Sequence, residues 1–241
     1  MTTKIEWCDE TWNPVTGCTP ISEACQHCYA SRMAKRLAGR YGYPTGDGFA
    51  VTLHPDKLNE PLRWKKPRRA FVCSMGDLFH EDVSDEWIKK VFNAMSTDIL
   101  QPCLHTYMIL TKRPKRMADF FAKNTKHGTE PWPNVWLGVT AENQARADER
   151  IPILLSIPAA VHFVSVEPML EPVDLCYSAF NGADSLSAMA GIDWVIAGPE
   201  TGPGARECPK YAISELADQC ESARVPFFDK RKDFIRREWP K

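Results

Sequence analysis

The chain of 241 residues has no long apolar segment. It contains no run of about eighteen apolar residues, the length that a membrane-spanning helix needs. Residues 1–7 are polar, so the N-terminus does not resemble a secretory signal peptide. The net charge is −1, which gives no overall field to attract nucleic acid. We therefore expect a cytoplasmic protein that does not enter a membrane.

Several common catalytic motifs are also missing. Residues 198–206 are rich in glycine, but they match neither a P-loop nor G-x-G-x-x-G. The six histidines are dispersed, with no H-x-x-x-H and no H-E pair on a predicted helix, which disfavours a zinc-dependent hydrolase. There is no internal repeat and no low-complexity linker. With 44% hydrophobic and 25% charged residues, the composition is that of a globular protein, and we predict one domain over residues 1–241.

Cysteine is abundant, and three of the nine cysteines are clustered. Cys18, Cys25 and Cys28 have the spacing C-x6-C-x2-C. In a reducing compartment such a cluster indicates a metal or catalytic site rather than disulfides. Structural zinc would need a fourth ligand, with Cys8, His27 or Cys73 as candidates. A [4Fe–4S] cluster held by three thiolates would leave one iron open to a substrate or cofactor.

Short apolar runs rich in β-branched and aromatic residues recur along the chain. Their near-continuous apolarity is typical of parallel strands buried on both faces. The predicted strands are residues 11–16, 49–53, 70–75, 106–111, 135–140, 161–166, 193–198 and 225–228. About eight strands suffice for a complete or partial βα barrel, which resembles a TIM barrel, with a doubly wound open sheet as the alternative.

Helical patterns lie between these strands. Predicted helices cover residues 29–37, 84–99, 141–155 and 211–224. The second begins with Ser84 as an N-cap and continues with an amphipathic stripe. Residues 181–191 are small and polar and indicate a loop or insertion.

Polar residues follow almost every predicted strand. Because the carboxyl ends of barrel strands form the functional face, these residues are expected to line a polar cavity. They include Ser74, Asp77, Thr111, Lys112, Arg113, Glu142, Ser165, Glu167 and Glu200. Cys73 lies within an apolar strand and is either a core residue or a hydrogen-atom donor. Glu200 and Arg206 on the glycine-rich loop either belong to a plain connection or bind charged groups of a ligand.

Segments along most of the chain resemble a family of phage- and prophage-associated proteins with a three-cysteine motif. The matching segments are residues 5–7, 11–18, 25–30, 33–37, 74–80, 110–114, 136–140, 165–168 and 198–202. The cysteine loop followed by a helix is similar to that of the radical S-adenosylmethionine (radical SAM) superfamily, where C-x3-C-x2-C is usual. This chain differs in the six-residue gap after Cys18, in Pro199, and in Asp229-Lys230 at the last strand.

The resemblance implies a barrel of the radical SAM type, with Cys18, Cys25 and Cys28 holding a [4Fe–4S] cluster. The open iron would bind S-adenosylmethionine, and a one-electron reductant would drive its cleavage to a 5′-deoxyadenosyl radical. The implied cofactor-binding residues are His27, Ser74, Asp77, Thr111, Glu142, Ser165, Glu167 and Glu200. Cys73 and Lys112 are candidate catalytic residues.

The substrate is not assigned by the sequence. Basic runs at residues 65–69, 112–116 and 230–237, with Trp64, Phe120 and Trp239 near them, favour modification or repair of a nucleic acid or nucleotide. The alternative from another class is a zinc- or cluster-stabilised, non-catalytic binding module that acts with a partner protein.

Overall fold

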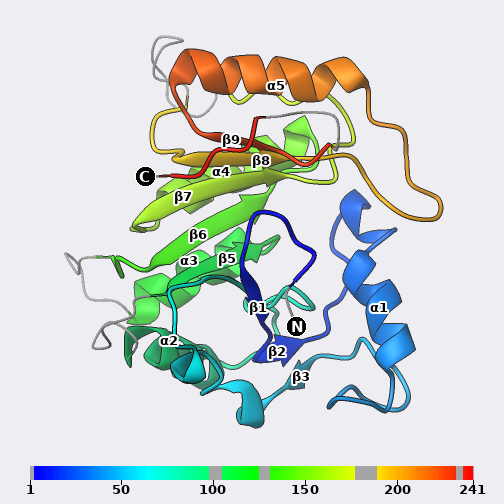
Figure 1. The fold of residues 1–241 in the computed structure, drawn as a ribbon, viewed down its shortest axis with the longest axis vertical. Coiled ribbons are helices and arrows are strands. Elements are labelled where there is room, and N and C mark those ends of the chain that lie inside the picture. The colour runs from blue at the N-terminus through cyan, green and yellow to red at the C-terminus, as the bar shows by residue number, and fades with distance from the viewer. Residues whose placement is uncertain (1–2, 98–104, 125–130, 177–188, 232–235, 241) are drawn as a thin grey trace.

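A curved sheet of seven parallel strands forms the centre of the molecule (Figure 1). The computed structural model describes residues 3–97, 105–124, 131–176, 189–231 and 236–240. The strands follow one another in sequence order, as in a barrel that is only partly closed. They are β1 (Glu10–Trp12), β4 (Arg69–Val72), β5 (Thr106–Thr111), β6 (Val135–Thr140), β7 (Val161–Val166), β8 (Trp194–Ala197) and β9 (Phe227–Asp229).

The sequential strand order decides between the two predicted architectures. A doubly wound sheet reverses its strand order at a switch point, whereas here each strand pairs with the next one along the chain. Within the described residues β9 does not pair with β1, so the sheet stays open. The prediction of a parallel α/β sheet is confirmed as a half-barrel, and the complete barrel is not formed.

The predictions for two strands, residues 49–53 and 11–16, were wrong in their pairing or extent. Residues 49–53 do not join the parallel sheet; instead β3 (Thr52–Leu53) pairs antiparallel with β2 (Val15–Thr16) in a separate small sheet. The predicted first strand is interrupted at Asn13-Pro14, because proline has no N–H to donate to a ladder. The main sheet therefore has one strand fewer than expected.

Helices fill the connections between strands. They are α1 (Tyr29–Leu37), α2 (Asp85–Thr97), α3 (Pro114–Asn124), α4 (Gln144–Leu155) and α5 (Lys210–Ala223). The Ser84 hydroxyl accepts from the backbone N–H of Trp87 at 3.3 Å, and Asn143 caps α4 by accepting from Arg146 N at 2.9 Å. Four helices were predicted and α3 was not. Its amino end matches the rule that proline suits the first helical turn.

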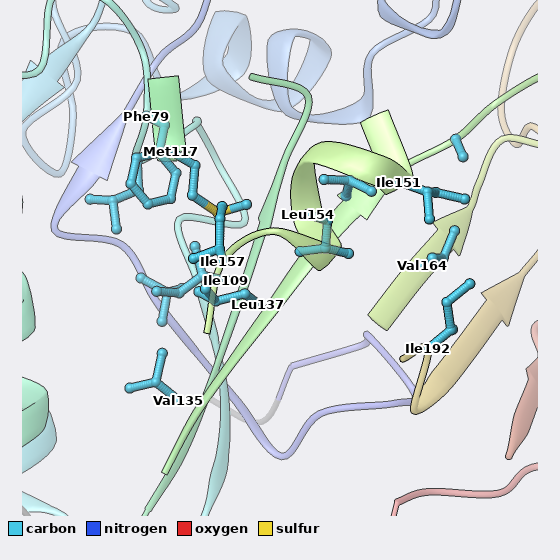
Figure 2. Packing of buried hydrophobic residues seen from close by; sticks show 14 of the residues in the cluster. Phe79, Ile109, Met117, Val135, Leu137, Ile151, Leu154, Ile157, Val164 and Ile192 are labelled. Atoms are coloured by element: carbon cyan, nitrogen blue, oxygen red, sulfur yellow. The ribbon is translucent and has the colours of Figure 1, made fainter. Parts of the chain in front are cut away.

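The larger apolar core lies between the sheet and its helices. Ile109, Leu137 and Val164 of successive strands face Met117 of α3 and Leu154 of α4 (Figure 2). All five side chains are buried. Packing of this kind removes apolar surface from water and supplies most of the stability of such a layer.

A second, smaller core fills the concave side of the sheet. It consists of Trp7, Cys8, Met108, Phe163, Trp194, Ile196 and Phe228. Gly138 is needed there, because a Cβ at this position would lie 2.5 Å from the Phe163 ring. The C-terminal segment covers this core, since Trp239 Nε1 donates to Trp7 O at 3.2 Å. The amino-terminal end of the half-barrel is therefore filled with aromatic side chains.

Some predicted features lie outside the described residues. These are most of the loop at 181–191, the last two residues of the helix at 84–99, and Lys232 of the third basic run. Over the part of the chain that the structure describes, no helix is both long and apolar enough to cross a membrane.

Candidate functional site

Most of the predicted site residues meet at a cavity of about 490 Å³ where the parallel strands end. Chain segments after β4, β5, β7 and β8 contribute to it, as does the cysteine loop before α1. The predicted residues that line it are Cys18, Cys25, His27, Cys28, Cys73, Ser74, Asp77, Thr111, Lys112, Arg113, Glu167 and Glu200. Strand-end residues from distant parts of the sequence thus converge, as parallel topology requires.

The cysteine loop is joined to the main sheet at Gly17. The Gly17 N–H donates to Met75 O at 2.9 Å, and Gly17 bridges Gly76 just beyond β4. Gly17 has φ +86°, and a Cβ there would lie 2.2 Å from Ala50 O. Only glycine suits this backbone. Cys18 follows directly, Cys25 ends the short 3₁₀ helix η1 (Glu23–Cys25), and Cys28 precedes α1.

The thiols of Cys18 and Cys25 have different environments. Burial raises the pKa of Cys18 to about 11, although the nearby Arg113 opposes this shift. Burial also disfavours the Cys25 thiolate, but hydrogen bonds with the backbone of Ile21 and Ser22 and the charge of Lys112 outweigh it, so the pKa of Cys25 is lowered. A metal that binds Cys18 near neutral pH must therefore displace a proton.

The three thiols line the same cavity but do not form a closed single-ion site within the described residues. Within the described residues, no three His, Cys, Asp or Glu side chains are gathered closely enough to hold a single metal ion. In a [4Fe–4S] cluster each thiolate binds its own iron, so the sulfurs need not converge on one point. Of the predicted fourth zinc ligands, His27 and Cys73 line the cavity, whereas Cys8 belongs to the smaller core.

Arg113 was predicted to line the cavity, but its contacts there were not predicted. Its guanidinium is buried beside the cavity and donates to Cys18 Sγ at 3.2 Å. It also donates to Asp77 Oδ2 at 3.3 Å, to Glu81 Oε2 at 2.9 Å and to Thr19 O at 3.1 Å. The planar fork of arginine holds five donors in a fixed geometry, whereas lysine has three donors on a single rotating nitrogen. The sequence places Arg113 after a strand but does not show these partners.

Asp77 and Thr111 form hydrogen bonds with Arg113 and with each other. The Thr111 hydroxyl donates to Asp77 at 2.8 Å, and the Asp77 carboxylate also accepts from the N–H of Phe79 at 3.0 Å. The Thr111 oxygen accepts from Arg113 N at 2.9 Å. The contacts of both residues are thus mainly with protein groups, and they position Arg113. Ser74 similarly donates to Asn13 Oδ1 at 3.2 Å.

Two further acids on the cavity wall are also paired. Glu167 forms an ion pair with Lys230, which follows the last strand. Glu200 accepts from Arg206 Nη2 at 2.6 Å and from Arg206 Nε at 2.9 Å. Hydrogen bonding to Arg206 lowers the pKa of Glu200.

The Glu200–Arg206 pair holds two loops together. Arg206 Nη2 donates to Glu23 O at 3.0 Å, and Arg206 Nη1 donates to the Gln26 side chain at 3.3 Å. The glycine-rich loop after β8 is thereby fixed to the cysteine loop. Figure 1 shows the segment between β8 and α5 extending toward α1. Glu200 and Arg206 therefore connect the glycine-rich loop to the cysteine loop through hydrogen bonds.

Glu142 and Ser165 do not line the cavity. Glu142 is buried and accepts from Arg150 Nη1 at 2.8 Å, while the same nitrogen donates to Thr140 O at 2.7 Å. Ser165 is buried within β7. A strand-end position alone cannot show whether a side chain points into the cavity or toward a helix.

Cys73 lines the cavity and is otherwise enclosed. It has φ +58°, a left-handed conformation that is uncommon for a residue with a side chain. Burial raises its pKa, so near neutral pH it is a protonated thiol. Backbone strain of this kind is concentrated at functional sites. Cys73 is therefore present as an S–H group on the cavity wall.

Comparison with known proteins places the chain in a family. A family model described as "Protein of unknown function (DUF5131)" matches residues 2–238. The chain belongs to the DUF5131 family. No curated protein and no solved structure matches it. The family description gives no activity, so the chemistry of this DUF5131 member must be argued from its cavity.

Proposed function

We propose that this DUF5131 protein is a radical SAM enzyme whose cluster is held by Cys18, Cys25 and Cys28. The observation that carries the proposal is the shared cavity. The three thiols line it together with polar side chains from the ends of β4, β5, β7 and β8. Three thiolates from one loop can hold three irons of a cluster and leave the fourth iron open.

When bound, the cluster and S-adenosylmethionine would supply a 5′-deoxyadenosyl radical that abstracts a hydrogen atom. The protein's own side chains hold the site around them. Arg113 fixes the Cys18 thiol, and Lys112 places positive charge near Cys25. Glu200 and Arg206 keep the glycine-rich loop against the cysteine loop.

Cys73 adds a further chemical group to the cavity. Because burial keeps its thiol protonated, it could donate a hydrogen atom to a carbon radical on a substrate. The S–H bond would break and a C–H bond would form. The thiyl radical left on Cys73 would return to the thiol with one electron from the reductant and one proton. Phe49, Phe71 and Leu110 form apolar parts of the same wall. A cavity wall that combines apolar side chains with an S–H donor suits radical chemistry.

The test is anaerobic reconstitution. The protein is loaded with iron and sulfide, reduced, and given S-adenosylmethionine, and 5′-deoxyadenosine is then measured. We expect iron and sulfide uptake and formation of 5′-deoxyadenosine, both lost in the C18A–C25A–C28A variant. The matched control is C176A–C208A, in which two partly exposed cysteines outside the cavity are removed.

Two outcomes would contradict the proposal. The first is uptake of zinc alone, which would instead support the non-catalytic binding module. The second is formation of 5′-deoxyadenosine at the same rate in the wild type and the triple variant.

A further inference from the structure

The basic runs that stand out in the sequence are largely neutralised in the fold. Within the described residues eight of their cations form ion pairs, seven with acids from other segments and Arg231 with the nearby Asp229, so the three runs do not make one free basic face. The pairs are Arg68–Glu10, Arg69–Asp9, Arg113–Asp77, Arg116–Asp85, Lys230–Glu167, Arg231–Asp229, Arg236–Glu221 and Arg237–Glu6. The aromatic residues near these runs are engaged as well, since Phe120 is buried and Trp239 packs on Phe228.

Helix α1 presents a basic face of a different kind. Its Ala30 and Ala34 are buried, so the opposite face at 100° per residue carries Arg32, Lys35 and Arg36. Arg40 follows the helix. No acidic residue occurs between Glu23 and Asp47. Over the part of the chain that the structure describes, these four cations have no ion-pair partner.

Two exposed tyrosines flank these cations. Tyr29 is 51% exposed and begins α1, and Tyr41 is 78% exposed just after Arg40. Both rings are therefore free to contact a ligand that also meets the cations of α1. Such rings stack with bases, while the cations neutralise phosphates. We call Tyr29, Arg32, Lys35, Arg36, Arg40 and Tyr41 the α1 surface.

The α1 surface is continuous with the thiol cavity. Cys28, Tyr29 and Arg32 all line the cavity, so the first turn of α1 is part of its wall. Arg32 Nη2 donates to Thr201 O at 3.0 Å. Its Nη1 is buried and has no hydrogen-bond partner within the described residues. Arg32 thus joins the first turn of α1 to the glycine-rich loop and places a cation without an ion-pair partner among the described residues at the cavity wall, where it would attract a phosphate.

We propose that the α1 surface binds single-stranded nucleic acid and directs one nucleotide into the cavity that contains the three thiols. Duplex nucleic acid would hide its bases from Tyr29 and Tyr41, whereas a single strand can stack on both. The delivery of a nucleotide as substrate rests on the proposed function, but binding along α1 does not. The two proposals can therefore fail separately.

Binding is tested with fluorescent single-stranded oligonucleotides of about 20 nucleotides, as DNA and as RNA, over about 50 to 200 mM salt. We expect affinity to fall with salt. We expect K35E–R36E to weaken binding at least about tenfold and to reduce the salt slope by about two. The matched control K65E–K66E reverses two exposed charges in a run predicted from the sequence, and it should bind within about twofold of the wild type.

A separate variant, Tyr29→Ala, tests the contribution of base stacking to binding. Tyr29→Ala should weaken binding about tenfold at every salt concentration, because it removes a stacking surface and no charge. Circular dichroism and thermal unfolding of each variant show that the fold is retained. The proposal would be overturned if K35E–R36E and K65E–K66E weakened oligonucleotide binding equally, or if the wild type bound no oligonucleotide. Binding to phosphatidylserine vesicles without binding to oligonucleotides would also overturn it.

Delivery into the cavity is tested in the metal-free protein. A saturating oligonucleotide should slow alkylation of Cys28 by iodoacetamide and leave alkylation of Cys176 unchanged, because Cys176 lies outside the cavity. Slowed alkylation of Cys28 alone supports delivery. Unchanged alkylation of Cys28 with a bound oligonucleotide overturns it, whatever the reconstituted enzyme does with S-adenosylmethionine.

Discussion

Arg113 Nη1 lies 3.2 Å from Cys18 Sγ, and the same nitrogen lies 3.3 Å from Asp77 Oδ2. A proposed cluster ligand and a buried acid thus share one cation. The contact makes the position of Cys18 depend on residues more than fifty positions away in the sequence. It also places a hydrogen-bond donor on a sulfur, an interaction through which proteins tune iron–sulfur sites.

Arg113→Ala should therefore damage both stability and metal binding. It leaves Asp77 buried without its cation, and we expect a loss of about 3 kcal/mol in the free energy of unfolding. Iron content after reconstitution should also fall. Urea unfolding and iron analysis measure the two effects.

Arg116→Ala is the matched control, because Arg116 also pairs with an acid but is less buried. Its loss should stay below about 1 kcal/mol. Arg113→Lys keeps the charge but not the planar fork, so its loss of unfolding free energy should lie between those of R113A and R116A. Equal stability and iron content in R113A and R116A would contradict the role given to Arg113.

Glu142→Gln tests whether this acid serves the fold rather than the cavity. It leaves the buried Arg150 without its carboxylate, so the expected loss is about 3 kcal/mol in unfolding free energy. Iron uptake should be unchanged once the variant is folded. The double variant E142L–R150M removes both charges and should recover stability relative to E142Q. An E142Q variant as stable as the wild type but unable to bind S-adenosylmethionine would restore the role predicted from the sequence.

Glu200→Gln should show a stability loss that depends on pH. The pKa of Glu200 is lowered in the folded protein, from an ordinary value of 4.5, by its hydrogen bonds to Arg206. Its contribution to stability is therefore complete above about pH 4.5 and is lost as pH falls through the lower, folded-state pKa. At pH 7 we expect E200Q to be about 1 kcal/mol less stable than the wild type.

Unfolding measured at several pH values checks this expectation. The difference between E200Q and the wild type should shrink below about pH 4.5. The exposed Glu207, on the same segment, provides the control variant E207Q, which should match the wild type throughout. A difference that does not change with pH would contradict the ion pair as its cause.

Gly17→Ala should displace the start of the cysteine loop. The added Cβ would lie 2.2 Å from Ala50 O, at a φ of +86°. We expect at least about 2 kcal/mol of destabilisation and reduced iron uptake. Gly46→Ala is the control, because a Cβ there meets nothing within 4 Å. Comparable unfolding midpoints for the two variants would show that the loop has room at Gly17.

Secondary structure was largely readable from the sequence where periodicity was strong. Residues 106–111 and 161–166 were predicted as buried strands and form β5 and β7. The pattern at 49–53 was equally apolar, yet it forms part of the small antiparallel sheet. Residues 49–53 are only partly buried or exposed, so apolarity alone predicted neither the burial of this segment nor the strand with which it pairs. Helix α3 was missed although its run contains the buried Met117, Phe120 and Phe121.

The sequence predicted which residues lie near the candidate site, but it did not predict which of their side chains contact one another. Parallel topology brings strand ends together, so Ser74, Thr111 and Glu167 could be expected at one edge. Which acids pair with which cations depends on side-chain directions across tens of residues. Glu142 turns toward Arg150, and Glu200 turns toward Arg206.

The sequence by itself determined the parallel α/β architecture, the three clustered thiols and the polar residues at the strand ends. These follow from local patterns, because burial periodicity and cysteine spacing are properties of short segments. Only the tertiary structure decided that the sheet remains open, that Arg113 holds Cys18, and that α1 carries the unpaired basic face. Each of these depends on contacts between distant segments, and a charge run becomes a surface or an ion pair only when its neighbours are in place.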